Sequence, residues 1–250
     1  MDISLSQPQA SIRHTRYPAV DVLRGWAILG VVLFHLVWDL AFLGLIPAQL
    51  AVHPAWIAFG RTVAATFMTL VGVSLALAAR GGLDPRAFGA RLVKIAAAAL
   101  VITVATRLTM PGAWVYFGIL HAIVVASLIG AAFLRAPSVL TFLLGGVIVA
   151  FGLAWTDPAF DARTVAWIGF AAAPAPSVDF APVFPWAGFT LIGLAVARAA
   201  LHRGWLDRLP RPEGRLARGL SRIGRRTLAV YLLHQPVLLA ILYPVAWLAA

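Results

Sequence analysis

The chain contains no cysteine among its 250 residues, and only nine of them are acidic. Without cysteine there can be no disulfide, no thiolate metal site and no cysteine acyl intermediate. Any nucleophile or general base must therefore be His, Ser, Thr, Tyr or a carboxylate. Charged residues of both signs make up 12% of the chain, well below the roughly 25% of a typical soluble domain.

Apolar residues, by contrast, make up 62% of the chain, and its mean hydropathy is +0.91. A soluble protein of this composition would have too little polar surface to face water, so the sequence predicts an all-α polytopic membrane protein in a lipid bilayer. A spanning helix needs roughly 20 apolar residues. Seven stretches meet this need: 20–43, 61–79, 92–109, 115–134, 138–155, 183–201 and 227–248. The apolar segment Ala166–Ala175 is too short to span and is predicted to be an interfacial or re-entrant piece.

The distribution of basic residues predicts the orientation. With the N-terminus inside, the inner segments hold 16 of the 20 basic residues, and the outer segments hold only Arg61, Arg107 and Arg163. Basic residues gather in cytoplasmic loops, so seven spans with N-in and C-out are expected in a multi-pass protein of the cell inner membrane. The net charge of +11 is thereby explained by topology, and no nucleic-acid partner is predicted.

The polar residues 1–15 are predicted to be a disordered cytoplasmic tail. Residues 16–250 are predicted to form a single transmembrane domain, with a basic, turn-rich inner loop from Leu201 to Ser221. No stretch remains for a soluble catalytic domain. Any chemistry that the protein performs is therefore expected inside the bilayer or at its two faces. The protein could be a monomer or an oligomer.

The first span carries four ionisable residues, Asp21, Arg24, His35 and Asp39, on an otherwise apolar helix. At about 100° per residue all four share an arc of roughly 60°, and Arg24 and His35 lie about 16 Å apart along the axis. Such a polar stripe must face protein or a water-filled cavity. Asp21 and Arg24 could equally form a simple ion pair. His35 with Asp39 one turn later is typical of a general base whose tautomer a carboxylate holds.

Other spans add polar candidates whose roles remain open. His121 lies about 10 Å below Trp114 and by depth can meet His35, although a structural hydrogen bond is at least as good an explanation. Asp179 precedes Trp186 at the outer mouth of the sixth span, where it is either an acceptor-side residue or an ordinary loop acid.

The last span contains His234 followed by Pro236, which removes an intrahelical hydrogen bond and frees a backbone carbonyl. His234 would lie about 10 Å from the cytoplasmic side, as a ligand or as part of a kink. The inner arginines Arg222, Arg225 and Arg226 are explained first by topology and second as a site for phosphates, because Arg binds them in a bidentate manner.

Several motifs, taken in order, resemble one known family. The run Asp21-Val-Leu-Arg24-Gly25 with Phe34-His35 and Trp38-Asp39-Leu40 resembles the start of the heparan-α-glucosaminide N-acetyltransferase-like membrane proteins. Three later pieces agree: Leu70-Val-Gly-Val-Ser-Leu75, Phe117-Gly-Ile-Leu-His121 and Phe184-Pro-Trp186 after Asp179. The ending Gly224–Pro236 is also similar, and the Arg24-x10-His35 spacing resembles a motif of the wider transmembrane acyltransferase superfamily.

This resemblance implies an acyl-CoA-dependent acyltransferase, with acetyl-CoA as the expected co-substrate and no metal. The acyl donor would approach from the cytoplasm and lie near Asp21, Arg24, the three inner arginines and His234. His35, held by Asp39, would deprotonate a sugar or other envelope acceptor at the outer face, by direct transfer or through an acyl-His. His121 would assist, and Asp179 and Trp186 would shape the acceptor side. The chain is short for the family and lacks the extra helices of its larger members.

Two other functions use the same residues. A transporter or flippase could employ the polar stripe as a substrate or proton path. A non-catalytic membrane subunit comes third. Against a transporter, the sequence shows no paired, broken-helix halves.

Overall fold

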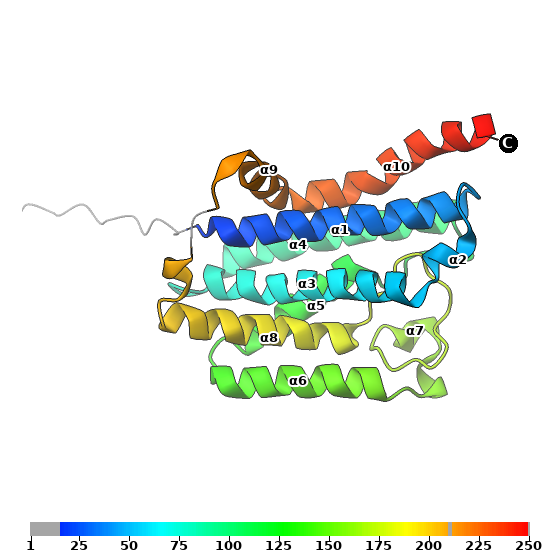
Figure 1. Ribbon diagram of the computed structural model, residues 1–250. Helices are drawn as coiled ribbons and strands as arrows, with labels where there is room; N and C mark the ends of the chain where they lie inside the picture. The colour runs from blue at the N-terminus through cyan, green and yellow to red at the C-terminus, as the bar shows by residue number, and fades with distance from the viewer. Residues whose placement is uncertain (1–15, 210–211, 250) are drawn as a thin grey trace, which may run out of the picture.

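The computed structural model describes residues 16–209 and 212–249, which are almost entirely helical (Figure 1). The elements are α1 (Pro18–Phe42), α2 (Ala48–Ala51), α3 (Pro54–Ala78), α4 (Pro85–Thr109), α5 (Ile119–Ala132), α6 (Ser138–Ala154), the 3-10 turn η1 (Pro158–Phe160), α7 (Arg163–Ala166), α8 (Val183–His202), the 3-10 turn η2 (Leu206–Arg208), α9 (Gly214–Gly224) and α10 (Thr227–Ala249). Within these ranges β-structure is limited to one isolated bridge between Asp157 and Ala171. The all-α prediction is therefore confirmed.

Each of the seven predicted apolar stretches contains one helix, but two of the helices begin earlier than predicted. α3 begins at Pro54 and α4 at Pro85, each with a proline in the first turn, where no intrahelical N–H bond is lost. Asp84 caps α4 by accepting hydrogen bonds from the backbone N–H groups of Arg86 and Ala87. Hydropathy marks only the most apolar part of such a helix, so its first turns, which in α4 carry Arg86 and Arg91, are assigned to the loop.

Five of the helices are long and apolar enough to cross a membrane: α1, α3, α4, α8 and α10. α5 and α6 are apolar but shorter, with 14 and 17 residues. A multi-pass membrane protein is thus supported, while the count of seven spans stays a prediction. α5 is shorter than predicted because Val115–Phe117 precede the helix in non-helical conformation.

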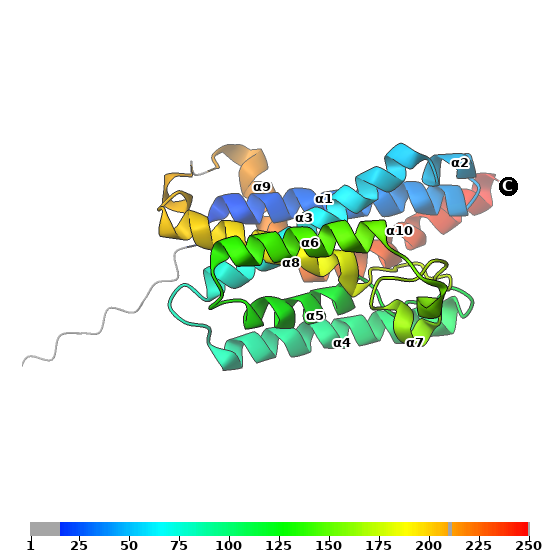
Figure 2. The same cartoon turned by 90° about the horizontal axis from the view of Figure 1, so that it is seen from below.

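The long helices lie roughly along one axis in both views, and successive helices run in opposite directions (Figures 1 and 2). α9 and η2 lie at the end where α1 begins, and α2 and α7 lie at the other end. The C-terminus of α10 lies at the α2 end, where α10 diverges from the bundle (Figure 1). The predicted interfacial segment Ala166–Ala175 overlaps the last residue of α7 and continues as irregular backbone. The predicted tail 1–15 lies outside the described residues.

α8 is the central helix, because it packs against α3, α5 and α6. Glycines allow these backbones to touch: a Cβ atom on Gly72 of α3 would lie 1.9 Å from the carbonyl oxygen of Thr190, and one on Gly193 of α8 would lie 2.1 Å from that of Thr69. The Thr190 hydroxyl also donates to the Met68 carbonyl oxygen at 3.0 Å. Small residues at close crossings are typical of helix packing in membranes.

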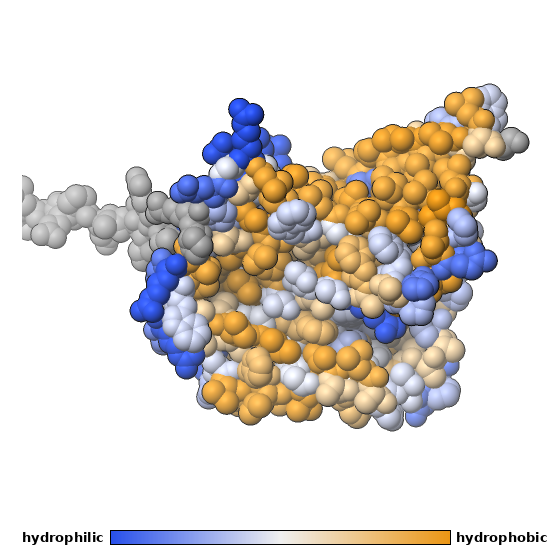
Figure 3. Space-filling view, viewed as in Figure 1, coloured by the Kyte–Doolittle hydropathy of each residue, from blue (hydrophilic) through white to orange (hydrophobic). Residues whose placement is uncertain are grey.

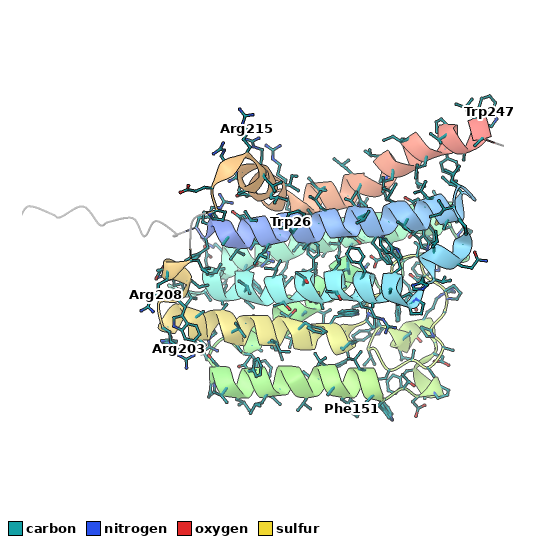
Figure 4. All side chains as sticks on the ribbon, in the orientation of Figure 1. Trp26, Phe151, Arg203, Arg208, Arg215 and Trp247 are labelled. Atoms are coloured by element: carbon teal, nitrogen blue, oxygen red, sulfur yellow. The ribbon has the colours of Figure 1, made fainter. Side chains whose placement is uncertain are left out.

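The outer surface carries large apolar side chains, and a hydrophobic band lies between more hydrophilic ends (Figure 3). Val93, Leu108 and Val139 are each about 70–80% exposed, which in water would be costly for so many residues. In Figure 4, Arg203, Arg208 and Arg215 lie at the α9 end, and Trp247 lies at the opposite end. This distribution suits a bilayer around the middle of the bundle.

The orientation can be tested with reporters. Because the basic residues concentrate at the α9 end, a reporter active only outside the cytoplasm should be active when fused after Ala250. The same reporter fused to the loop after α8 should be inactive, and it provides the internal control. Activity of a cytoplasm-only reporter after Ala250 would contradict the seven-span topology.

Candidate active site

A cavity of about 510 Å³ lies between α1, α3, α4, α5, α10 and the segment that precedes α8. Most of its walls are apolar side chains. Its polar lining residues come from every one of these elements except α5: Arg24, His35, Arg61, Ser74, Arg91, Lys94, Asp179, Thr227 and Tyr231. The polar stripe of α1 therefore faces a cavity, as the sequence predicted for its Arg24 and His35.

One end of the cavity is held by an ion pair on α1. Arg24 Nη1 lies 2.9 Å from Asp21 Oδ1, and Arg24 Nη2 donates to the Ser74 hydroxyl at 2.6 Å. Arg16 Nε lies 3.2 Å from the other carboxylate oxygen of Asp21, whose side chain is buried. The sequence left open an ion pair or a ligand-binding role. The structure shows the ion pair, and it also places Arg24 on the cavity wall.

Arg91 and Lys94 of α4 line the same end of the cavity, and the sequence interpretation missed both of them. The sequence prediction starts the apolar stretch at residue 92, which puts Arg91 in the loop and Lys94 at the inner edge of the span, so both are counted with the inner basic residues. Since α4 begins at Pro85, both lie inside the helix, and their i, i+3 spacing puts them on one face. Asp21 neutralises Arg24, and among the described lining residues no second carboxylate lies at this end. The surplus positive charge favours an anionic ligand.

The three inner arginines lie elsewhere. Arg222, Arg225 and Arg226 are exposed on α9 and the turn after it, and they do not belong to the cavity lining. α9 crosses α1 so closely that a Cβ atom on Gly224 would lie 1.8 Å from the Asp21 carbonyl oxygen. This crossing turns the basic face of α9 outward. The three arginines therefore lie outside the cavity lining, and their role in binding acyl-CoA phosphates stays a prediction.

His35 lies about 16 Å further along α1, at 1.5 Å per residue from Arg24. Its Nδ1 is 2.9 Å from the Val31 carbonyl oxygen. A carbonyl can only accept, so Nδ1 carries the proton when the ring is neutral, and Nε2 keeps its lone pair. The ring lines the cavity. The Val31 carbonyl thus performs the tautomer selection that the sequence assigned to Asp39.

Asp39 has a different partner. In place of the predicted bond to His35, its Oδ1 accepts a hydrogen bond from Gln235 Nε2 of α10 at 2.6 Å, and the side chain is fully buried. Side chains of a helix lean toward its N-terminus, which brings His35 onto the carbonyl one turn earlier. Asp39 therefore connects α1 to α10, and it makes no hydrogen bond to the His35 ring.

His234 lies beside His35. Its ring packs edge-on against that of His35, with centroids 4.8 Å apart, and only 9% of the residue is exposed. Its Nδ1 contacts the Tyr231 carbonyl oxygen, and its Nε2 has no hydrogen-bond partner within the described part of the chain. His234 is not among the residues that line the cavity, and its role in binding acyl-CoA stays a prediction.

His121 does not line the cavity. Its Nδ1 accepts a hydrogen bond from the Gly118 N–H at 3.1 Å, and its Nε2 lies 3.4 Å from the Thr103 hydroxyl. These bonds cap the start of α5 and connect it to α4. The arrangement favours the structural alternative that the sequence left open, and a meeting of His121 with His35 is not observed.

Asp179 lines the cavity on the side away from Arg24, together with Trp186. Its carboxylate accepts hydrogen bonds from the Ile119 N–H at 3.1 Å and from the Tyr231 hydroxyl at 2.9 Å. Burial raises the pKa of the Asp179 carboxyl, although both hydrogen bonds oppose this shift. Asp179 therefore connects α5 to α10 as part of the site, and it is not an ordinary loop acid.

The cavity thus combines a cationic end, an imidazole with a bare Nε2 in the middle and a carboxylate–phenol pair at the other end. Over the described residues no group of three or more His, Asp or Glu side chains is arranged to hold a metal ion. The chemistry that the site offers is proton transfer or nucleophilic attack by an imidazole on a ligand held by its anionic part.

Comparison with known proteins agrees with this arrangement. The family model described as heparan-alpha-glucosaminide N-acetyltransferase, catalytic, matches residues 16–236, which include every residue of the cavity lining. No curated protein and no solved structure matches the chain significantly. Because the family model covers most of the 250 residues, the chain belongs to the heparan-alpha-glucosaminide N-acetyltransferase catalytic family of membrane acetyltransferases.

Proposed function

We propose that the protein transfers an acyl group, most simply acetyl, from acyl-CoA to a hydroxyl or amine of an envelope sugar or another small acceptor. The observation that carries the proposal is the single cavity in which His35 lies between an uncompensated cationic end and the Asp179 end. The membrane is taken to be the inner membrane, with the cationic end toward the cytoplasm.

Arg24, Arg91 and Lys94 bind phosphate groups of the acyl donor in this proposal, and the Ser74 hydroxyl keeps the Arg24 guanidinium in place. Charge-assisted hydrogen bonds to phosphate are strong, and a partly buried site weakens them less than water does. The exposed Arg222, Arg225 and Arg226 would contribute long-range attraction, which salt screens.

His35 acts as the general base. Its Nε2 removes the proton from the acceptor O–H or N–H, and the acceptor oxygen or nitrogen attacks the thioester carbonyl carbon. The C–S bond then breaks, and the CoA thiolate receives the proton from the imidazolium. In the covalent variant Nε2 itself attacks the thioester carbonyl carbon, and the C–S bond breaks to give the CoA thiolate and an Nε2-acyl imidazolium. The acceptor oxygen or nitrogen then attacks the acyl carbon, the N–C bond to Nε2 breaks, and the acceptor's proton passes through Nε2 to the thiolate. Both routes need an unprotonated Nε2, and the hydrogen bond from Nδ1 to the Val31 carbonyl favours the tautomer that provides it.

His234 and Asp39 are positioning residues in this scheme. The His234 ring packs against one side of His35, and the Asp39–Gln235 bond keeps the two helices in register. Asp179, Tyr231 and Trp186 form the acceptor side, where a carboxylate, a phenol and an indole ring suit a sugar with hydroxyl groups and an apolar face.

Loss of the base should abolish transfer. His35→Ala should lower kcat/KM by about 10²–10⁴-fold, the usual contribution of general-base catalysis, while the protein still inserts and binds CoA. The measurement is acetyl transfer from acetyl-CoA in nanodiscs to a panel of amino sugars. His121→Ala is the matched control and should lose stability before it loses turnover. Near-normal turnover by His35→Ala would exclude the mechanism, and CoA-independent movement of a sugar would favour a transporter.

The donor site should depend on α4 and not on α9. Arg91→Gln with Lys94→Gln should weaken CoA binding by about tenfold or more, because each change removes a charge-assisted hydrogen bond. Arg222→Gln with Arg225→Gln removes the same charge from the exposed α9 region and should change affinity little at 0.15 M salt. Isothermal titration with CoA in detergent distinguishes them. Equal losses in both pairs would show that general electrostatic attraction accounts for binding.

The Asp39–Gln235 pair should affect stability more than chemistry. Asp39→Asn keeps an oxygen that can accept from Gln235, so turnover should stay close to that of the unchanged protein. Gln235→Leu leaves the buried Asp39 carboxylate without its donor and should cost about 1–3 kcal/mol of stability. Thermal unfolding in detergent measures the cost. A large kcat loss in Asp39→Asn with unchanged unfolding would instead show that Asp39 orients His35.

A further inference from the structure

A second pocket, of about 700 Å³, lies on another side of α3. It is formed where α3 and α8 end and where the chain turns from α5 to α6, and it shares no lining residue with the first cavity. On α3, Leu70, Val71 and Ser74 face the first cavity, whereas Ala76, and Arg80 in the turn after α3, line this pocket. The pocket is therefore a separate feature of the bundle end near α9.

Four basic side chains line the pocket: Arg80, Arg135, Arg198 and His202. Arg198 Nη1 donates to the carbonyl oxygens of Phe133 and Ala136, at 3.2 and 2.7 Å, which leaves its other N–H groups available. Arg80 donates to the Tyr17 hydroxyl at 2.7 Å. These bonds hold two of the cations in place before any ligand arrives.

The charge in this pocket is not balanced from within. Arg80 lies 3.8 Å from Asp207, which is a weak and half-exposed contact. Arg135 and His202 make no side-chain hydrogen bond or ion pair with any residue that the structure describes, and none of the described lining residues is acidic. Arg198 is thus fixed by carbonyl oxygens without an acidic partner, and a basic cluster of this kind is typical of a site for a phosphate group.

The remaining wall of the pocket is apolar. It consists of Ala76, Leu83, Ala131, Leu134 and Leu201, all near the ends of apolar helices. The pocket thus joins a cationic rim to a hydrocarbon wall at the end of the bundle where the surface becomes hydrophilic (Figures 3 and 4). A soluble anion would use only the rim, whereas an amphiphile would use both parts.

We propose that this pocket binds an anionic bilayer lipid, with its phosphate among Arg80, Arg135, Arg198 and His202 and the start of an acyl chain along Leu83, Leu134 and Leu201. Basic pockets between membrane helices on the cytoplasmic side are suited to lipid phosphates. The bound lipid would connect α3, α8 and the turn after α5. It would thereby stabilise the helix pair α3–α8 at the centre of the bundle, since a ligand that binds only the folded state raises stability.

The test is thermal unfolding of the full chain in a neutral detergent with three additives: phosphatidylglycerol, phosphatidylcholine and inorganic phosphate. Phosphatidylglycerol should raise Tm, and the zwitterionic lipid and free phosphate should not. Arg135→Gln with His202→Gln should weaken phosphatidylglycerol binding, measured by native mass spectrometry, by about tenfold or more, because each change removes a hydrogen bond to the phosphate. Both side chains make no intramolecular bond, so the variant should fold normally.

The matched control is Arg215→Gln with Arg218→Gln, two exposed arginines on α9 outside the pocket. This variant should keep the affinity for phosphatidylglycerol. Equal weakening in both variants would overturn the site and leave only general attraction to a basic surface. A Tm rise with inorganic phosphate as large as that with phosphatidylglycerol would overturn the lipid as the occupant. Acyl transfer plays no part in this experiment, so its outcome is independent of the proposed function.

Discussion

The cost of placing polar side chains in an apolar medium is the constraint on which the rest of this structure depends. α1 carries four ionisable residues, and each of them has a polar partner. Asp21 pairs with Arg24, His35 donates to the Val31 carbonyl, and one carboxylate oxygen of Asp39 accepts from Gln235, while its other oxygen has no hydrogen-bond partner among the described residues. The Arg24–Ser74 and Asp39–Gln235 bonds connect α1 to α3 and α10, and the cavity lies where the stripe faces inward. The position of the candidate site is thus a consequence of satisfying the polar groups of one helix.

Close helix crossings make this arrangement possible. Gly72 and Gly193 bring α3 and α8 into backbone contact, and Gly25 and Gly224 do the same for α1 and α9. α10 begins three residues after Gly224, so the second crossing precedes it directly along the chain. Along α10, His234 packs on His35 of α1, with ring centroids 4.8 Å apart. The two ends of this helix pair are thus joined by a glycine crossing and by a contact between two histidines.

The basic residues at the α9 end of the bundle are there for more than one physical reason. The inner arginines and Lys94 satisfy the charge bias of membrane insertion as a group. Within the group, however, Arg91 and Lys94 line the first cavity together with Arg24 of α1, Arg80, Arg135 and Arg198 line a separate pocket, and Arg222, Arg225 and Arg226 are exposed. Topology accounts for their side of the membrane, and packing accounts for what each can bind.

The sequence alone determined the membrane class, the all-helical fold, the seven apolar helices, the polar stripe of α1 and the family, because hydropathy, helical periodicity and motif spacing are all local properties of the chain. It placed Arg24 and His35 correctly on a cavity. The tertiary structure alone decided that Gln235 is the partner of Asp39, that His121 is a cap, and that Arg91 and Lys94 belong to the site. Partners across helices depend on where each helix begins and at which residues it crosses its neighbours. Helix starts depend on prolines in the first turn, and crossings depend on glycines that contact distant segments. The periodicity of residues along one helix gives no information on either.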